Sequence, residues 1–389
     1  MIMIQKILTL LVCACVLICC LSGCASAEIR DYTGAGETAA PEQSETLTEE
    51  MTDYSYAYAA HAPDEQVMTV NGLPVYWDEC FYWLNYAAVL LEYYSEAVED
   101  WDAECTLDST MTNREFVADY ALDSLVQYRA LETGAAESGA VISDEQQAEL
   151  DALWDSDVQT YAGGDEAEFE KMLADQYMDR DTYEYLNRVT ELYYSCMELL
   201  FGPNGEKCAD TDVLEYADST GYVYVKHILF STVDENSEPI EDEKKAEKKT
   251  LAESTLAEIR EAEQQGRDAL TEKFDELMDK YNEDPGYEYY KDGYCSMTSD
   301  FVGEFGAACE ELGDYEVSDI VETSYGYHII LRLPMSADAV VVYYSEDEQY
   351  TIRSVAASDF YAAVVSGWIE QAQVEYAEGF KDGNLADCF

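Results

Sequence analysis

Two apolar, strand-like runs that each contain a histidine constrain the fold of this chain more than any other feature. The first is Val225-Lys226-His227-Ile228-Leu229, and the second is Tyr325-Gly326-Tyr327-His328-Ile329-Ile330. The 389-residue sequence has only three histidines. A single histidine in a strand is usually a core residue with satisfied hydrogen bonds. Two histidines in such similar settings, in a chain this poor in histidine, predict that one folded site brings them together.

The residues around these runs predict a small α+β domain. Residues 222–227 alternate in the manner of a strand. Helices are expected at 244–264, 270–281 and 301–312, and further strands at 317–321 and 327–333. An Asp284-Pro285-Gly286 turn separates the second helix from the third. The resulting order is one strand, two helices, a loop, a third helix and two strands.

About 115 residues, from Gly221 to Pro334, resemble the parvulin family of peptidyl-prolyl isomerases in this order and in both histidine motifs. The resemblance implies catalytic roles for His227, Asp284, Thr323 and His328. The histidines match a hydrogen-bonded pair at the floor of the parvulin pocket, where they orient and polarise their neighbours. Asp284 matches a Cys or Asp that faces the substrate carbonyl, although turn formation explains an Asp before Pro-Gly equally well. Thr323 matches a hydroxyl group of the same network.

The resemblance also implies that Phe301, Phe305 and Tyr325 bind the substrate. Phe301 and Phe305 match the aromatic positions of the parvulin proline pocket. Their spacing of four residues puts them on one face of a helix, as it would two ordinary core residues. Tyr325 matches a position that is Ser in some parvulins and aromatic in many bacterial ones.

The chain departs from the family pattern at two places. Residues 290–296 stand where parvulins usually have Gly-Gly-Asp-Leu-Gly-x-Phe, so that Ser296 replaces an aromatic residue of the pocket. This change predicts a wider pocket and a lower activity. The loop at 231–235 lacks the Lys/Arg cluster that binds phosphate in phospho-specific parvulins. Specificity for phosphoserine-proline is therefore not expected.

The first 23 residues have the pattern of a lipoprotein signal peptide. Lys6 precedes an apolar run, 7–20, that is too short to span a bilayer comfortably. The run leads into Leu21-Ser22-Gly23-Cys24, which resembles the lipobox of bacterial lipoproteins. An ordinary secretory signal, cut at Ala25 or Ala27, is the alternative. The resemblance implies that lipidated Cys24 anchors the chain to the outer face of the bacterial cell membrane.

The remaining sequence predicts a spacer and a helical domain in two parts. Residues 24–64 are acidic and almost free of aliphatic side chains, which indicates a flexible linker; its histidine, His61, receives no role. A strand at 67–70, an Asn-Gly turn and a helix capped by Asp78 resemble the start of the chaperone domain in PrsA- and SurA-type foldases. Further helices are expected at 114–132, from 144, and at 166–175, 181–200 and 211–217. A final helix at 358–380 is expected to pack on the helices between residues 78 and 200.

Composition excludes some functions. The 83 Asp and Glu residues outnumber the 21 Lys and Arg residues, and the resulting formal net charge of −62 would repel nucleic acid. A hydrophobic content of 48% supplies enough side chains for a core. Seven cysteines follow Cys24, but they are irregularly spaced and lack a Cys-x-x-Cys motif. Neither a disulfide framework nor a zinc site is indicated.

Together these features predict an α+β protein in which a parvulin-like isomerase domain is inserted into a mostly helical chaperone domain. The expected segments are a signal peptide (1–23), a linker (24–64), the first part of the helical domain (65–219), the isomerase domain (220–334) and a C-terminal segment that packs on the helical domain (335–389). The resemblance implies a foldase outside the cytoplasm that isomerises X–Pro bonds in exported proteins and holds unfolded clients. It implies no cofactor and no metal ion.

Two alternatives remain open at this level. A catalytically weak or inactive parvulin-fold chaperone lipoprotein is favoured by Ser296 and opposed by the histidine pair and Phe305. A solute-binding or adhesive lipoprotein would explain the anchor and the linker, but not the two histidine motifs. The sequence does not predict the clients, the state of the thiols or the oligomeric state, for which a dimer is one option.

Overall fold

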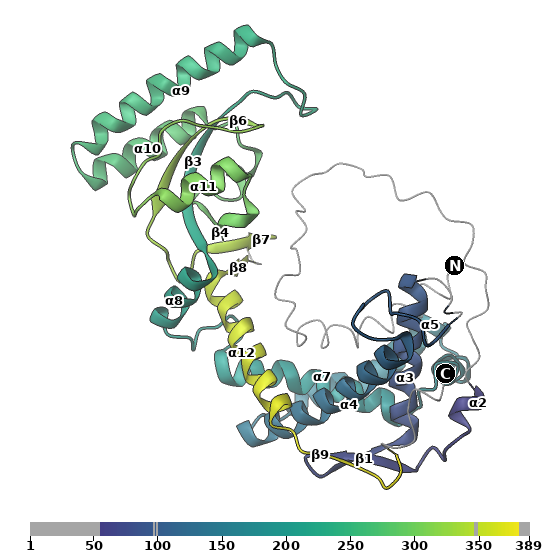
Figure 1. The fold of residues 1–389 in the computed structure, drawn as a ribbon. Coiled ribbons are helices and arrows are strands. Elements are labelled where there is room, and N and C mark those ends of the chain that lie inside the picture. Colours follow the sequence, from purple (N-terminus) through teal and green to yellow (C-terminus); the bar gives the residue numbers. More distant parts are fainter. Residues whose placement is uncertain (1–54, 96–97, 99, 346–348, 381–389) are drawn as a thin grey trace. The chain divides into compact units, whose positions relative to one another are not determined.

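The computed structural model describes residues 55–95, 98, 100–345 and 349–380 (Figure 1). The signal peptide, Cys24 and most of the expected linker lie outside these residues. The chain divides into two compact units. The first contains the described residues up to Leu200 and from Phe360 onward, and the second is Phe201–Asp359. No helix of the described segments is both long enough and apolar enough to cross a membrane.

The first unit is mostly helical. Its helices are α2 (Ser55–Tyr58), α3 (Trp77–Ser95), α4 (Asn113–Ser138), α5 (Asp144–Ala162), α6 (Glu166–Ala174) and α7 (Arg180–Phe201), which ends one residue beyond the division. The sequence predicted the start of α5, where Ser143 and Gln146 form a capping box. Asp78 was expected to cap α3, but the helix begins at Trp77 and places Asp78 in its first turn.

A small sheet completes the first unit, with strand order β2-β1-β9. The expected Asn-Gly turn joins β1 (Gln66–Val70) to β2 (Leu73–Tyr76). Asn71 has φ 52° and Gly72 has φ 80°, the left-handed conformations that a two-residue hairpin turn requires. This prediction is confirmed.

The packed chain begins before the expected end of the linker. Ala57 is buried, and the Trp77 indole N–H donates to the Tyr58 carbonyl at 2.8 Å. The His61 ring lies 4.5 Å from the Trp77 indole, between centroids. Residues 55–64 are therefore held against the start of α3, because Trp77 supplies both a large apolar surface and a donor.

The C-terminal helix differs from its prediction at both ends. Helix α12 spans Ile352–Glu370, and the strand β9 (Val374–Tyr376) follows it where the helix was expected to continue. Strand β9 pairs antiparallel with β1, so a partner about 300 positions earlier in the sequence determines its conformation. In the first unit, the Tyr361 ring of α12 lies 4.8 Å from the Tyr193 ring of α7. The Trp368 indole lies so close to Gly134 of α4 that a Cβ atom there would come within 2.1 Å of it.

The second unit is built on an antiparallel sheet of order β4-β3-β6-β5. Its strands are β3 (Tyr222–Ser231), β4 (Tyr294–Met297), β5 (Val321–Glu322) and β6 (Gly326–Leu333), and a separate hairpin consists of β7 (Val340–Tyr343) and β8 (Gln349–Thr351). Its helices are α8 (Asp210–Thr220), α9 (Asp242–Glu263), α10 (Arg267–Tyr281) and α11 (Gly303–Glu311), with 3-10 turns at Pro285–Glu288 and Thr298–Asp300.

Two of the expected elements are shorter in the structure. The strand expected at 317–321 is present only as β5; Val317 makes an isolated bridge to Leu331 instead. The helix expected at 301–312 begins at Gly303, because Phe301 has the extended conformation φ −82°, ψ 159°.

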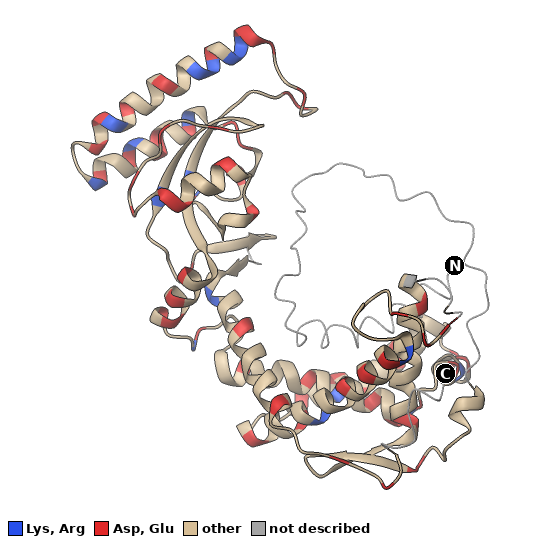
Figure 2. Ribbon diagram, in the orientation of Figure 1, with Lys and Arg blue, Asp and Glu red and all other residues tan. Residues whose placement is uncertain are grey.

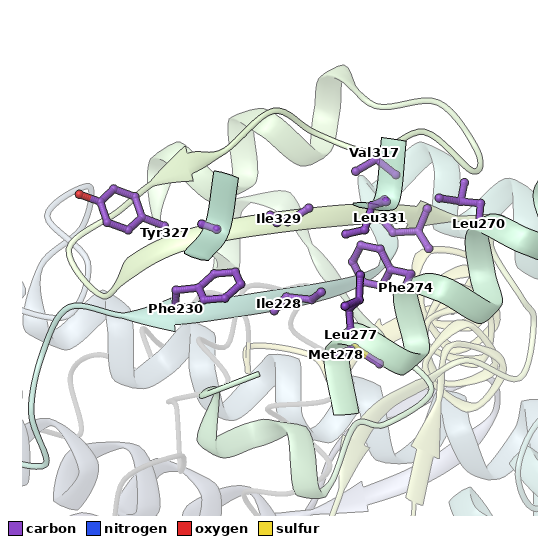
Figure 3. Close-up of a cluster of buried hydrophobic side chains, with 12 residues drawn as sticks. Ile228, Phe230, Leu270, Phe274, Leu277, Met278, Val317, Tyr327, Ile329 and Leu331 are labelled. Carbon is purple, nitrogen blue, oxygen red and sulfur yellow. The ribbon is translucent and has the colours of Figure 1, made fainter. Parts of the chain in front are cut away.

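The two faces of the sheet have different roles. On one face, apolar side chains of β3 and β6 pack against α9 and α10 and form a buried cluster (Figure 3). Ile228 and Ile329 in this cluster are fully buried, and full burial of such a side chain contributes roughly 1.5–3 kcal/mol. Because side chains alternate along a strand, the neighbouring residues His227 and His328 face the other side, toward α11. The apolar core thus fixes the direction in which both histidines point.

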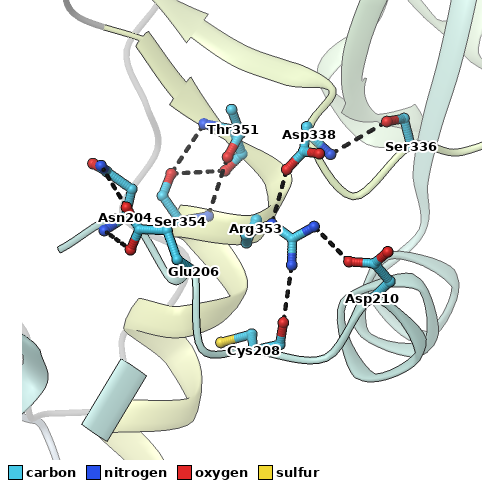
Figure 4. A network of polar contacts seen from close by, with 9 residues as sticks. All are labelled: Asn204, Glu206, Cys208, Asp210, Ser336, Asp338, Thr351, Arg353 and Ser354. Carbon is cyan, nitrogen blue, oxygen red and sulfur yellow. Dashed lines mark hydrogen bonds and ion pairs between the residues drawn. The ribbon is translucent and has the colours of Figure 1, made fainter. Parts of the chain in front are cut away.

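Arg353, near the start of α12, connects the segments that enter and leave the sheet domain (Figure 4). Its guanidinium group donates to Asp210 at 2.6 Å, to Asp338 at 2.8 Å and to the Cys208 carbonyl at 2.9 Å. The pKa of Arg353 is raised by its hydrogen bonds to the two carboxylates. The planar guanidinium can serve three acceptors at once, which a lysine cannot do with the same geometry.

Candidate active site

The pairing of β3 with β6 brings the two histidines together. Leu229 pairs with His328, and His227 pairs with Ile330, so the histidines occupy neighbouring positions on one face of the sheet. Their Nδ1 atoms are 3.3 Å apart. Both side chains are buried, with 8% of His227 and 4% of His328 exposed. The sequence-based prediction of one site containing both histidines agrees with this geometry.

Asp284 lies beside the second ring nitrogen of His227, Nε2. Its Oδ2 atom is 3.1 Å from His227 Nε2, and the Tyr294 hydroxyl donates to the same oxygen. Its Oδ1 atom accepts the backbone N–H of Gly286 at 3.3 Å, which caps the 3-10 turn at Pro285–Glu288. The two explanations for Asp284, turn formation and membership of the site, are therefore compatible: one oxygen caps the turn and the other contacts the histidine.

Thr323 extends the network beyond the second histidine. Its Oγ1 atom lies 2.9 Å from His328 Nε2, and it accepts the backbone N–H of Tyr325 at 3.1 Å. The four residues with expected catalytic roles thus form one line of contacts, from Asp284 through His227 and His328 to Thr323.

The electrostatics set the direction of these hydrogen bonds. Burial raises the pKa of Asp284, but the hydrogen bond with His227, the charge of that histidine and the bonds from Tyr294 and Gly286 outweigh it, so the pKa is lowered. The ionised carboxylate can only accept, and His227 Nε2 therefore carries a proton. Burial and, to a smaller extent, the charge of His227 lower the pKa of His328 to about 3 although Asp284 opposes them, so His328 is neutral near pH 7.

The line of contacts then has two consistent arrangements. When His227 is neutral, His328 Nδ1–H donates to His227 Nδ1, and the Thr323 hydroxyl donates to His328 Nε2. When His227 carries both protons, it donates to His328, and His328 Nε2–H donates to Thr323. A charge at one end of the network therefore reverses the hydroxyl dipole at the other end.

Aromatic rings form an apolar wall beside this network. The Phe305 centroid lies 5.2 Å from each histidine centroid in edge-to-face geometry, and 4.9 Å from the Phe301 centroid. Phe305 is buried, whereas Phe301 is half-buried. The expectation that both rings share a helix face is wrong, because Phe301 precedes α11, yet the rings are in contact. Tyr325 contributes its backbone N–H to Thr323, and 48% of its side chain is exposed.

Comparison with known proteins identifies this part of the chain. Residues 212–332 match the family described as the PPIC-type PPIASE domain. They form a parvulin domain. No curated protein matches the sequence.

Solved structures of PrsA proteins resemble the chain over most of its length. PrsA from Bacillus subtilis is 20% identical, with 70% of this chain and 91% of that chain covered and a TM-score of 0.24. A PrsA from Bacillus cereus is 18% identical, with coverages of 75% and 97% and a TM-score of 0.29. Foldase protein PrsA from Streptococcus pneumoniae is 14% identical, with coverages of 64% and 82% and a TM-score of 0.21.

Tyr294 is a residue of the parvulin domain site that sequence reasoning missed. It pairs with Val225 in the register of β4 and β3, and its ring centroid lies 5.3 Å from that of His227. Burial and the neighbouring Asp284 raise the pKa of the Tyr294 hydroxyl, which keeps it a donor. Nothing singles it out among the 33 tyrosines of the sequence. Only the short distance in sequence between Asp284 and β4 could have indicated that Tyr294 belongs to the site.

Ser296, which stands in place of an expected aromatic residue, takes part in a different contact. Its hydroxyl donates to Asp300 Oδ2 at 3.1 Å, at the 3-10 turn that precedes α11. The wall of the parvulin domain site therefore rests on Phe301, Phe305 and Tyr294. The wider pocket expected from Ser296 stays a prediction.

The two thiols of the parvulin domain, Cys295 and Cys309, are buried. Burial raises the pKa of both Cys295 and Cys309 to about 12, so both thiols stay protonated near pH 7. None of the six cysteines within the described residues forms a disulfide bond. Those same residues contain no group of three or more His, Cys, Asp and Glu side chains placed to hold a metal ion.

Proposed function

We propose that this chain catalyses cis/trans isomerisation of X–Pro bonds. One observation carries the proposal: the line of contacts from Asp284 through His227 and His328 to Thr323 runs beside the Phe305 ring in a domain of the PPIC type. The apolar wall suits a proline ring, and the polar line suits the amide whose bond rotates.

The geometry supports a mechanism that makes and breaks no covalent bond. Rotation about the amide has a barrier of ~18–20 kcal/mol because it removes the resonance between nitrogen and carbonyl. That resonance places negative charge on the carbonyl oxygen. A fixed carboxylate at Asp284 disfavours this charge in the planar amide, and so favours the twisted state by comparison. Phe301 and Phe305 hold the ring while the carbonyl turns.

A proline-peptide isomerisation assay on the chain without its first 24 residues tests this proposal. We expect the wild-type chain to accelerate isomerisation of an Ala-Ala-Pro-Phe peptide. Asp284→Ala should lower kcat/KM by at least about tenfold, a loss of ~1.4 kcal/mol in transition-state binding. Asp319→Ala is the matched control, since the Asp319 side chain is 97% exposed and its contact with Arg260 is weak at 3.4 Å. Equal activity of Asp284→Ala and wild type would contradict the mechanism.

We also propose that the protein acts on exported proteins as a membrane-anchored foldase, and that its helical unit holds unfolded clients. The lipobox-like sequence before Cys24 and the helical unit, whose two segments precede and follow the parvulin domain in sequence, support this. Cys24→Ser should release the chain from membranes or leave it as the unprocessed precursor, because no thioether can form. A mutant chain of mature length that still sediments with membranes would refute the anchor.

A catalytically weak or inactive chaperone is the second candidate. It is favoured by the Ser296 hydroxyl, which bonds to Asp300, and by the Tyr294 hydroxyl, which donates to Asp284. Ser296 leaves the pocket without the expected aromatic ring, and the Tyr294 hydrogen bond occupies an oxygen of the Asp284 carboxylate. An aggregation-suppression assay beside the peptide assay separates the candidates: suppression without isomerisation identifies the chaperone alone.

A further inference from the structure

Four tyrosines form a line of rings that begins at the candidate active site and ends at the surface. We call Tyr294, Tyr290, Tyr343 and Tyr289 the tyrosine ladder. The ring centroid of Tyr290 lies 4.8 Å from that of Tyr294 and 6.5 Å from that of Tyr343. The Tyr343 and Tyr289 centroids are 5.7 Å apart. Because Tyr294 donates to Asp284, the ladder is continuous with the site.

The ladder is built from β4, from the loop at Tyr289 and Tyr290 that precedes it, and from the neighbouring β7–β8 hairpin. Tyr294 begins β4, which is an edge strand of the sheet, and the β7–β8 hairpin lies beside it (Figure 1). The backbone N–H of Tyr343, in β7, donates to the Tyr290 hydroxyl at 3.3 Å. Tyr343 pairs with Gln349, and Val342 pairs with Tyr350. Since successive side chains of a strand point to opposite faces, Tyr350 lies on the other face of the hairpin.

The outer end of the ladder is open to solvent. Tyr289 is 56% exposed, whereas the other three tyrosines are half-buried. A tyrosine presents a large apolar ring with a polar tip and loses little conformational entropy on binding, which is why tyrosine is enriched in protein interfaces. An ordered row of such rings, starting at a site for X–Pro bonds, is a surface on which a polypeptide can lie.

The charge around the ladder defines what it attracts. Glu288 and Asp292 are exposed and flank Tyr289 and Tyr290 in sequence, with Lys291 as the one basic residue between Tyr287 and Gly293. Figure 2 shows acidic residues on both units, in keeping with the formal net charge of −62. Carboxylates attract Lys and Arg side chains, and aromatic ring faces bind the same cations. An acidic peptide would be repelled here.

We propose that the tyrosine ladder docks the segment of a client that flanks the proline, and that it selects segments carrying Lys or Arg. This inference rests on the proposed isomerase function, whose substrate class it narrows. The proline occupies the wall made by Phe305 and Phe301. The flanking chain then crosses Tyr294 and Tyr290, and a basic side chain lies over Tyr289 beside Glu288 and Asp292.

The test uses the chain without its first 24 residues and two fluorescein-labelled peptides. Both contain one Ala-Pro bond; one has three lysines on each side of it, and the other has three glutamates. Fluorescence anisotropy gives the affinities, and the isomerisation assay gives kcat/KM for the same peptides. We expect tighter binding and a higher kcat/KM for the lysine peptide, with the preference decreasing as salt is added.

Matched variants assign the preference to the ladder. Tyr289→Ser and the double variant Glu288→Gln/Asp292→Asn should each weaken lysine-peptide binding by about threefold or more. Tyr350→Ser removes an exposed ring from the other face of the hairpin, and Glu253→Gln/Glu258→Gln removes two exposed charges from α9. Both controls should retain wild-type affinity for the lysine peptide.

The outcomes separate this inference from the proposed function. Equal affinities for the two peptides, or equal losses in the ladder and control variants, overturn the ladder even if an unflanked peptide is isomerised. A lysine preference that depends on Tyr289, Glu288 and Asp292 supports the ladder even if no peptide is isomerised. That result would contradict the proposed isomerase function and support the tyrosine ladder as a docking surface.

Discussion

The Nδ1 atoms of His227 and His328 lie 3.3 Å apart in the buried layer between the sheet and α11. At this distance one ring must donate and the other must accept, so only one of the two Nδ1 atoms can carry a proton. The two side chains therefore respond together to any change at either end of the network. This coupling distinguishes a site from two independent core histidines.

The coupling can be measured with a double-mutant cycle. We expect His227→Asn and His328→Asn each to reduce kcat/KM by at least about tenfold, because each leaves the other ring without its partner. The double mutant should lose less than the sum of the two single losses, with a coupling energy of about 0.5–3 kcal/mol. Isomerisation of a proline peptide gives the rates, and circular dichroism controls for folding. Additive losses would mean that the histidines act independently.

The buried state of His328 predicts a pH-dependent stability. Its pKa is lowered to about 3 in the folded chain, below the ordinary value of about 6.5 that applies on unfolding. Between these pH values the unfolded chain binds a proton that the folded chain does not, so the free energy of unfolding decreases as pH falls from 6.5 toward 3. The loss at pH 4 should be on the order of a few kcal/mol.

Replacing His328 isolates this effect. His328→Gln should be less stable than wild type at pH 7, but its stability should depend less on pH between 7 and 4. Hydrogen exchange of β3 and β6 peptides, followed by mass spectrometry, reports the domain directly. Tryptophan fluorescence would not report the parvulin domain, because all five tryptophans lie outside it, at positions 77, 83, 101, 154 and 368. Parallel pH dependences of the variant and the wild type would show that His328 is not the titrating group.

The sequence predicted the parts of the site that depend on strand pairing. Alternation along β3 and β6 puts His227 and His328 on one face, and the apolar neighbours Ile228 and Ile329 leave no alternative register without exposing the core. Most helices were predicted to within a few residues because their caps are local signals, as with Ser143, but α12 differs from its prediction at both ends.

The sequence could not predict contacts that depend on distant partners. Strand β9 forms because β1 offers it an edge, and neither segment reveals the other. Phe301 adopts an extended conformation because the 3-10 turn before α11 ends there, although its spacing from Phe305 suits a helix. Tyr294 joins the site through the register of β4 with β3, which a short strand in a tyrosine-rich sequence does not specify.

Phe305 should contribute to both stability and substrate binding. Phe305→Ala removes a buried ring that touches both histidines, and we expect a loss of about 3–5 kcal/mol in the free energy of unfolding. Phe305→Leu keeps most of the apolar volume and should cost less than about 1.5 kcal/mol. The leucine variant should stay folded but bind proline peptides with a higher KM. An unchanged KM would remove Phe305 from the pocket.

Helix α12 should stabilise the helical unit through Tyr361. This ring is fully buried and lies against Tyr193 of α7. Tyr361→Ala should destabilise the first unit by about 3–5 kcal/mol, as expected for a large buried aromatic residue. Tryptophan fluorescence follows this unit alone, because all five tryptophans belong to it. The exposed Tyr350→Ala serves as a control. An unchanged fluorescence transition in Tyr361→Ala would contradict a structural role for α12.

The Tyr294 hydroxyl should tune the Asp284 carboxylate, which we propose faces the substrate. Its hydrogen bond favours the ionised form of Asp284, so Tyr294→Phe should raise the pKa of that carboxyl while keeping the ring. In the wild type, activity that depends on ionised Asp284 is lost as pH falls through the lowered pKa. In Tyr294→Phe, the same loss should begin at a higher pH, with little change at pH 8. The pH profile of kcat/KM for both proteins measures the shift, and Tyr290→Phe controls for loss of a neighbouring hydroxyl. Coincident acid limbs for wild type and Tyr294→Phe would show that the Tyr294 hydroxyl does not act on Asp284.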